Sequence, residues 1–201
     1  MRPATLLGLG ALDLRGSVVQ VMTGSAGGAG VAWSPGMVIT SAHVAPGREV
    51  TLVLPDGTAL PGEVLARDRR RDLALIRGPF ELPAIESADP ARLRPGALVF
   101  AVGHPLGVRQ AISAGVFQAL GRLPDGLARR GMDPRLAWVQ ADIRLAPGNS
   151  GGPIADSEGR VIGIAAMIVG GLALAVPSPE VGAFLLGAGG PEMGDGAGGG
   201  R

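Results

Sequence analysis

Turn-forming residues divide this sequence into many short apolar runs, and no other feature constrains its fold so strongly. Ser-Pro-Gly at 34–36, Pro-Gly at 46–47 and Asp-Gly at 56–57 each border such a run. Proline presets φ for a turn and glycine permits positive φ, so the runs end abruptly. With 35 glycines, 17 prolines and only 3% aromatic residues, the chain favours short strands over long helices. We therefore predict an all-β fold.

The predicted strands form two sets of six, separated by a proline-rich linker at residues 81–95. The first set comprises residues 17–22, 29–33, 37–40, 49–54, 60–66 and 72–76. The second set comprises residues 97–102, 110–119, 137–141, 152–155, 160–169 and 172–176. Two halves of similar length predict two six-stranded antiparallel β-barrels, at about 17–80 and 96–178, with a cleft between them.

The remaining segments flank this double barrel. Residues 179–186 predict a short closing helix, and the glycine-dominated residues 187–201 predict a disordered tail. Residues 1–16 predict an N-terminal flap, because their apolar stretch leads to no small-residue cleavage site. Residues 161–176 are uncharged and nearly long enough to span a membrane, but Gly170 and Gly171 interrupt them. We expect two buried strands there and no transmembrane segment.

Composition argues against several classes of partner. The net charge is only +1 and opposite charges are interspersed, so we expect no binding of nucleic acid. The absence of cysteine excludes disulfides and thiolate metal sites. Neither of the two histidines has acidic residues at ligand spacing, so we expect no metal and no cofactor.

The strongest local signal is GNSGGP at residues 148–153. Its glycines allow backbone N–H groups to converge beside the hydroxyl of Ser150, as a nucleophilic serine requires. A loop with a helix-capping serine is the simpler alternative. The segment also matches the G-x-S-x-G elbow of α/β-hydrolases, but there the histidine follows the serine, whereas His43 and His104 both precede Ser150. The subtilisin order would need Asp13 as its acid, in a region without supporting pattern.

The order His, Asp, Ser places each residue in a suitable context. His43 follows the apolar strand that begins at Val38, which predicts an imidazole at a barrel rim. Asp72 opens an otherwise apolar strand, where a carboxylate needs a partner such as an imidazole N–H. Asp68 is the competing acid, but it lies among arginines in a predicted solvated hairpin. His104, in a glycine-rich turn, is expected to be structural.

Together the motifs resemble the chymotrypsin-fold serine peptidases, and within them the HtrA/Deg branch. The resemblance covers residues 17–186. It is carried by TSAHV (40–44), DLALI (72–76), GHPLG (103–107), SAGVFQALGR (113–122), QADIRLAPGNSGGP (140–153), GRVIGI (159–164) and LALAVPS (172–178).

The resemblance implies a serine endopeptidase that acts on polypeptide substrates through a covalent acyl-enzyme. It assigns His43 as the general base, Asp72 as the acid that orients it and Ser150 as the nucleophile. The oxyanion hole falls on the N–H groups of Gly148 and Ser150. Digestive relatives carry an aspartate at the position of Asn149, which pairs with a newly cleaved N-terminus. An amide needs no such ion pair, so we expect activity without N-terminal processing.

The resemblance also implies the position of the specificity pocket. Its floor falls on Arg144, Leu145 and Ala146, and its wall on Met167 and Ile168. No acidic residue is present to select lysine or arginine. An inward Leu145 predicts small aliphatic P1 residues, which we favour, whereas an inward Arg144 predicts acidic ones.

Several properties stay open at this point. A catalytically weak or inactive relative that binds peptides or acts like a chaperone is the alternative function. Residues 1–16 lack the aromatic residues through which HtrA relatives form trimers, so a monomer or small homo-oligomer is expected. The resemblance suggests a bacterial periplasmic or extracytoplasmic site, and the cytoplasm stays open.

Overall fold

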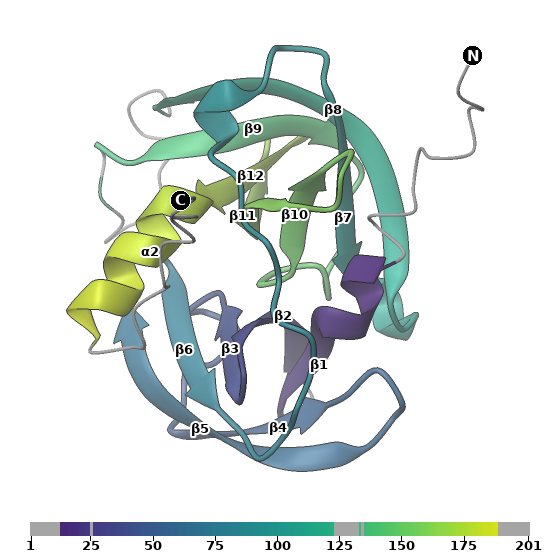
Figure 1. Ribbon diagram of the computed structural model, residues 1–201, viewed down its shortest axis with the longest axis vertical. Coiled ribbons are helices and arrows are strands. Elements are labelled where there is room, and N and C mark those ends of the chain that lie inside the picture. The colour runs from purple at the N-terminus through teal and green to yellow at the C-terminus, as the bar shows by residue number, and fades with distance from the viewer. Residues whose placement is uncertain (1–12, 25, 123–132, 134, 189–201) are drawn as a thin grey trace, which may run out of the picture.

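The backbone forms two closed antiparallel barrels of six strands each, stacked on one another (Figure 1). The computed structural model describes residues 13–24, 26–122, 133 and 135–188. The first barrel contains β1 (Val18–Thr23), β2 (Ala26–Ser34), β3 (Met37–Thr40), β4 (Glu49–Val53), β5 (Ala59–Asp68) and β6 (Leu73–Arg77). The second contains β7 (Leu98–Gly103), β8 (Ala111–Arg122), β9 (Ala137–Ile143), β10 (Pro153–Asp156), β11 (Val161–Val169) and β12 (Leu172–Pro177). The predicted fold class is confirmed.

Both barrels have the same strand order. In the first, the order is β1-β2-β3-β6-β5-β4, and pairing of β1 with β4 closes the barrel. In the second, it is β7-β8-β9-β12-β11-β10, closed by pairing of β7 with β10. The third strand therefore lies against the sixth, with Thr40 opposite Ala74 in the first barrel. This pairing brings the turn after β3 beside the turn before β6.

Three apolar clusters hold the molecule together. One fills the first barrel and includes Leu52 and Ile76, and another fills the second and includes Ile154 and Ile162. The third joins the barrels, where Ile39 and other side chains of the first barrel share a cluster with side chains of the second. Fully burying one such aliphatic side chain contributes roughly 1.5–3 kcal/mol. The barrels are thus packed against one another through a shared apolar interface.

The connection between the barrels also belongs to both of them. The N–H of Ile85 donates to the carbonyl of Ala32 at 3.1 Å, and that of Ala88 donates to the carbonyl of Val161 at 2.9 Å. Ser87 forms an isolated bridge with Val161, and a 3-10 turn, η3 (Pro90–Arg92), follows. The segment predicted as a linker therefore ties the first barrel to the second.

The helix α2 (Ser178–Gly187) follows β12 and packs against β6, β11 and β12. Its bounds agree closely with the predicted helix at 179–186. Val181, Phe184 and Leu185 are buried in the cluster that joins the barrels. In Figure 1 the helix lies along the side of the molecule, beside β6 of the first barrel. It consequently braces the two barrels against one another.

The long uncharged stretch at 161–176 forms β11 and β12. Gly170 and Gly171, with φ of 58° and 88°, make the turn between them, as only residues tolerant of positive φ can do readily. No helix among the described residues is both long and apolar enough to cross a membrane. Most of the predicted N-terminal flap at 1–16 and almost all of the predicted tail at 187–201 lie outside the described residues.

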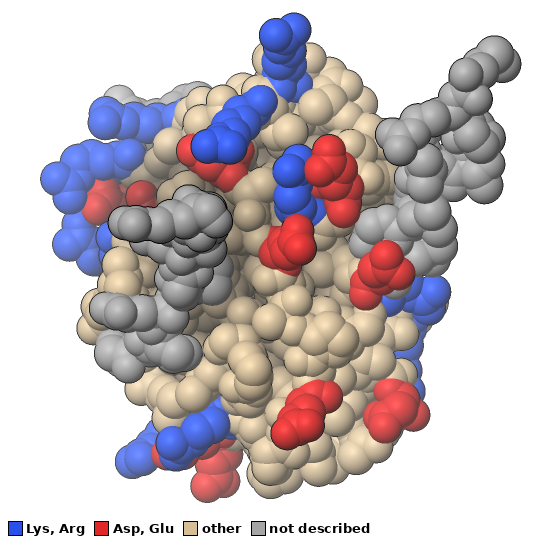
Figure 2. All heavy atoms as spheres, viewed as in Figure 1, with Lys and Arg blue, Asp and Glu red and all other residues tan. Residues whose placement is uncertain are grey.

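Figure 2 shows basic and acidic side chains scattered over the visible face, often beside one another. The ion pairs of the described residues include Arg160 with Asp156 at 2.8 Å and Arg77 with Glu63 at 2.7 Å. Positive and negative side chains are thus interspersed on this face.

Candidate active site

His43 and Asp72 meet because their two turns lie side by side at one end of the first barrel. His43 follows β3 in a turn that the N–H of Val44 closes by donating to the carbonyl of Ser41 at 3.0 Å. Its Nδ1 lies 2.8 Å from Oδ2 of Asp72, and its backbone N–H donates to Oδ1 of Asp72 at 3.0 Å. The N–H of Ala42 donates to the carbonyl of Asp72 at 3.1 Å. Three hydrogen bonds thus lock the two turns together.

Asp72 is held in an unusual conformation and environment. Its side chain is only 9% exposed, whereas that of His43 is 34% exposed. Its φ of 57° lies in the left-handed region, which aspartate tolerates better than most residues but which still costs energy. A buried carboxylate that accepts from both the backbone and Nδ1 requires the proton on Nδ1. The second ring nitrogen, Nε2, is then left as the acceptor that a general base needs.

Asp68, the competing acid, is occupied within its own turn. Its Oδ1 accepts from the N–H groups of Arg70 at 2.8 Å and Arg71 at 3.1 Å. Its Oδ2 accepts from the guanidinium of Arg71 at 2.7 Å. Within the described part of the chain, no hydrogen bond or ion pair joins Asp68 to His43. The geometry therefore favours Asp72 over Asp68 as the partner of the imidazole.

Ser150 belongs to the loop between β9 and β10, which lies directly against the first barrel. The carbonyl of Ser150 accepts from the N–H of Ala29 in β2 at 2.8 Å. The carbonyl of Ala165 in β11 accepts both from the N–H of Gly151 at 2.7 Å and from Oγ of Ser41 at 3.1 Å. Ser41 lies two residues before His43, and Gly151 directly follows Ser150. These contacts bring the serine loop and the histidine turn together at the boundary, or seam, between the two barrels.

The structure does not, however, include every contact of a working triad. Ser150 is half-buried, and the hydrogen bonds among the described residues include none between its Oγ and Nε2 of His43. The pairing of His43 with Asp72 is therefore explicit in the structure. The approach of Ser150 follows from the contacts of its loop.

Two glycines are required by the conformation of the serine loop. Gly148 has a φ of 103°, and a Cβ there would collide with the carbonyl oxygen of His104. Gly151 has a φ of 83°, and a Cβ there would collide with Oγ1 of Thr40 and the carbonyl of Ala29. Among the described residues, neither the N–H of Gly148 nor that of Ser150 donates to an acceptor. The two N–H groups expected to form the oxyanion hole are thus not occupied by an acceptor from the described part of the chain.

The arrangement matches a known family. The family model of the trypsin-like peptidase domain matches residues 28–164, which contain His43, Asp72 and Ser150. The chain belongs to the trypsin-like peptidases.

Relatives place this trypsin-like peptidase near the HtrA branch, as its sequence predicted. Serine protease HTRA1B of Danio rerio is 33% identical over 154 residues, covering 75% of this chain and 32% of the relative. Mitochondrial serine protease HTRA2 of Drosophila pseudoobscura pseudoobscura is 33% identical over 171 residues, covering 83% of this chain and 40% of the relative. The chain therefore spans about a third of the length of the curated relatives it matches.

Solved structures agree with this placement. The HtrA-type protease AlgW with a tripeptide matches with a TM-score of 0.80 and 28% identity, covering 90% of this chain and 64% of that one. The Rv3671c protease of M. tuberculosis, solved in an inactive form, matches with a TM-score of 0.80 and 25% identity. That match covers 93% of this chain and 96% of that one.

The residues expected to form the specificity pocket have different environments. Arg144 is exposed, whereas Leu145 is half-buried and packs against the core of the second barrel. Ala146 is half-buried, and its carbonyl accepts from the N–H of Asn149 at 3.0 Å. Met167 is only 6% exposed and belongs to the cluster between the barrels, while Ile168 is 50% exposed. The side chains of Leu145 and Ile168 are therefore better placed than that of Met167 to touch a ligand.

Two hydroxyl groups that hold the site together were not singled out by the sequence analysis. Oγ1 of Thr40 donates to the carbonyl of Ala29, and Oγ of Ser41 donates to the carbonyl of Ala165 in the other barrel. Both hydroxyls are buried. The sequence signal for the role of these two hydroxyls was their position directly before His43. Buried hydroxyls need hydrogen-bond partners, so they were candidates to hold the turn.

His104 is buried and supports the serine loop through its backbone. Its N–H donates to the carbonyl of Gly148 at 3.0 Å. Its Nδ1 accepts from the N–H of Gln110 at 3.3 Å. Burial lowers the pKa of His104 below its usual value, although a backbone contact with Val19 opposes the shift. A neutral ring that accepts at Nδ1 is consistent with the predicted structural role.

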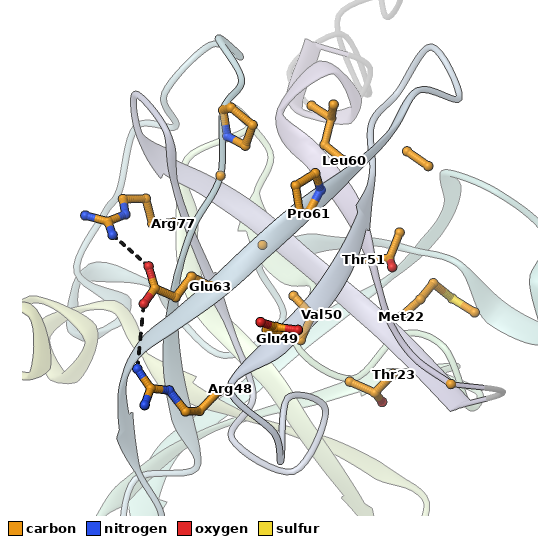
Figure 3. Close-up of a pocket in the computed structure, with 15 residues that line it drawn as sticks. Met22, Thr23, Arg48, Glu49, Val50, Thr51, Leu60, Pro61, Glu63 and Arg77 are labelled. Carbon is orange, nitrogen blue, oxygen red and sulfur yellow. Dashed lines mark hydrogen bonds and ion pairs between the residues drawn. The ribbon is translucent and has the colours of Figure 1, made fainter.

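Two further features lie apart from this seam. A hollow of about 1230 Å³ lies on the first barrel, where Arg48 and Arg77 both pair with Glu63 (Figure 3). None of the predicted site residues lines it. The described residues contain no group of three or more histidine, cysteine or acidic side chains able to hold a metal ion.

Proposed function

We propose that this trypsin-like peptidase is a serine endopeptidase that hydrolyses peptide bonds in unfolded or flexible polypeptides. The observation that carries the proposal is the buried pairing of Asp72 with Nδ1 of His43 at the seam where the loop of Ser150 meets the first barrel. An imidazole held in this tautomer presents Nε2 as a base. Ser150, in a loop with glycines of positive φ at 148 and 151, supplies the hydroxyl.

In the proposed acylation, Oγ of Ser150 attacks the carbonyl carbon of the scissile bond while its proton passes to Nε2 of His43. The new C–O bond converts the carbonyl to an oxyanion, which accepts from the N–H groups of Gly148 and Ser150. Collapse of this intermediate breaks the C–N bond, and the proton on Nε2 moves to the leaving amine. Asp72 stays ionised and stabilises the imidazolium while it exists.

Deacylation repeats these steps with water as the nucleophile. His43 takes a proton from the water, whose oxygen bonds to the acyl carbon. The ester bond to Oγ of Ser150 then breaks, and the serine oxygen recovers the proton from Nε2. The products are a carboxylic acid and an amine, and the protein returns to its starting state.

Specificity is proposed to follow from the segment before the serine loop and from β11. The exposed position of Arg144 and the packing of Leu145 against the second barrel favour an apolar pocket for small aliphatic P1 side chains. Beyond Ala165, β11 pairs with β12 on one side only. An extended substrate can add to that open edge through its backbone. A peptide library should therefore be cleaved after residues such as valine or alanine, and cleavage mainly after acidic residues would favour Arg144 instead.

A non-catalytic peptide-binding module is the second candidate. It is favoured by the missing hydrogen bond between Ser150 and His43 in the described structure, together with the open edge of β11. Binding alone, however, does not account for a buried carboxylate held on an imidazole.

The Ser150→Ala variant separates the two candidates. Wild-type protein and the variant are incubated with casein and, separately, with a fluorophosphonate probe, and Ser157→Ala serves as control because Ser157 is an exposed turn residue. The endopeptidase proposal expects hydrolysis and labelling in the wild type and the control, and neither in Ser150→Ala. Casein binding without hydrolysis in all three proteins would favour the binding module.

A further inference from the structure

The turn that delivers Asp72 to the site is held from outside by charged side chains. The turn connects β5 to β6 and occupies residues 69–72, with Asp68 at the end of β5. Asp72 adopts left-handed φ at the last position of this turn. A residue in that conformation persists only where surrounding contacts determine it. The contacts that determine this turn therefore also determine where the carboxylate points.

Arg71, directly before Asp72, makes the main side-chain contacts of the turn. Its Nε donates to Oε2 of Glu180 in the first turn of α2 at 2.7 Å. Its terminal nitrogen donates to Oδ2 of Asp68 at 2.7 Å. These two hydrogen bonds, with Glu180 as the stronger partner, raise the pKa of Arg71. Arg71 thus connects the turn to a helix 109 residues further along the chain.

The ion pair between Arg71 and Glu180 is better sheltered from solvent than ordinary surface ion pairs. The side chains of Arg71 and Glu180 are 37% and 36% exposed, and that of Asp68 is 19% exposed. Glu180 also lies where the helix dipole favours an anion. A guanidinium fixed by two carboxylates loses less conformational freedom for each bond than one in an isolated pair. Arg70, in the same turn, pairs instead with Asp133 at 3.0 Å.

We infer that Arg71 is a positioning residue for Asp72, and that its ion pair with Glu180 links the helix α2 to the orientation of the candidate catalytic histidine. The path is short. Arg71 fixes the peptide unit that precedes Asp72, Asp72 accepts from the backbone and Nδ1 of His43, and His43 presents Nε2 to the seam. Loss of the pair frees the turn to relax from left-handed φ, so the carboxylate holds the imidazole less firmly.

The expected signature is catalytic and not only structural. A less firmly held carboxylate orients the imidazole of His43 less well, so proton transfer from Ser150 to Nε2 slows. Substrate contacts are unchanged, so KM stays constant while kcat falls. A purely structural role would lower the melting temperature and leave kcat of the folded protein unchanged.

The test compares Arg71→Gln and Glu180→Gln with Arg71→Lys and the control Arg69→Gln. Arg69 lies in the same turn, is exposed and has no ion pair among the described residues. We expect both Gln variants at 71 and 180 to lower kcat about fivefold and to leave KM unchanged. Arg71→Lys should retain most of the activity, and Arg69→Gln should match the wild type. Equal behaviour of all four variants would overturn the inference.

This inference rests on the proposed function, so a readout independent of hydrolysis is included. A proton on Nδ1 of His43 that is bonded to the carboxylate of Asp72 should give a far-downfield signal in the NMR spectrum of the intact protein. Arg71→Gln should broaden or shift this signal, and Arg69→Gln should leave it in place. If the wild type cleaves nothing, the proposed function has failed, while this signal still decides whether Arg71 positions Asp72. An identical signal in all the variants would refute the positioning role.

Discussion

The contact between the serine loop and the first barrel makes Gly151→Ala the most informative single substitution. A Cβ at this position would lie 2.9 Å from the backbone nitrogen of Ser41, and closer still to Oγ1 of Thr40 and the carbonyl of Ala29. Two of these three neighbours are backbone atoms of strand and turn, which cannot rotate away. The alanine must therefore push the loop of Ser150 away from the turn of His43.

The expected loss in the free energy of unfolding of Gly151→Ala has two contributions, one from backbone strain and one from overpacking. The φ of 83° places an alanine in the left-handed region at roughly 1–2 kcal/mol. Overpacking against a rigid neighbour adds roughly 1–3 kcal/mol. The sum of roughly 2–5 kcal/mol is below the stability of many domains, so we expect a folded but weakened protein.

Gly170→Ala is the matched control, because Gly170 has a φ of 58° and no atom lies within 4 Å of the position that the alanine methyl group would occupy. Gly170→Ala should show only the destabilisation that comes from the left-handed φ. Urea denaturation of the wild type and both variants measures the free energies of unfolding, and the rate of fluorophosphonate labelling measures the site. Gly151→Ala should be less stable than Gly170→Ala by roughly 1–3 kcal/mol and should label much more slowly. If the two variants were equally stable and labelled at the same rate, the argument from close contact would be refuted.

Two further predictions concern Asp72 and His104. Asp72→Asn should lower kcat by about 10⁴. An amide has only one acceptor oxygen for the two N–H donors that now bind the carboxylate. Steady-state cleavage of a chromogenic peptide measures the loss, and a loss below tenfold would contradict the prediction. The pKa of His104 is lowered by burial, so the unfolded chain binds its proton first as the pH falls. The wild type should therefore lose stability relative to His104→Asn below about pH 6.5, measured by urea denaturation at several pH values, and a constant difference would contradict it.

Local patterns account for most of the fold. Each strand is short and bordered by turn residues, so its existence is visible in a window of a few residues. The candidate triad was also accessible, because chain order and the glycines around Ser150 are properties of the sequence itself. Its assignment remains a proposal, while the family and the two barrels are confirmed.

Tertiary structure alone decided how these residues are held. Alternation along β11 predicts that neighbouring side chains face opposite sides of the sheet. The pairing register of β11 with β12 shifts, however, between Ala165 and Met167. Which side chain of β11 faces the core therefore depends on this pairing. The bond from Ser41 to Ala165 spans 124 residues, and that from Arg71 to Glu180 spans 109. Contacts at such separations depend on how both barrels and α2 pack. The sequence by itself therefore determined which residues are available for chemistry, and packing between distant segments decided their geometry, because a local pattern carries no information about which distant surface it will meet.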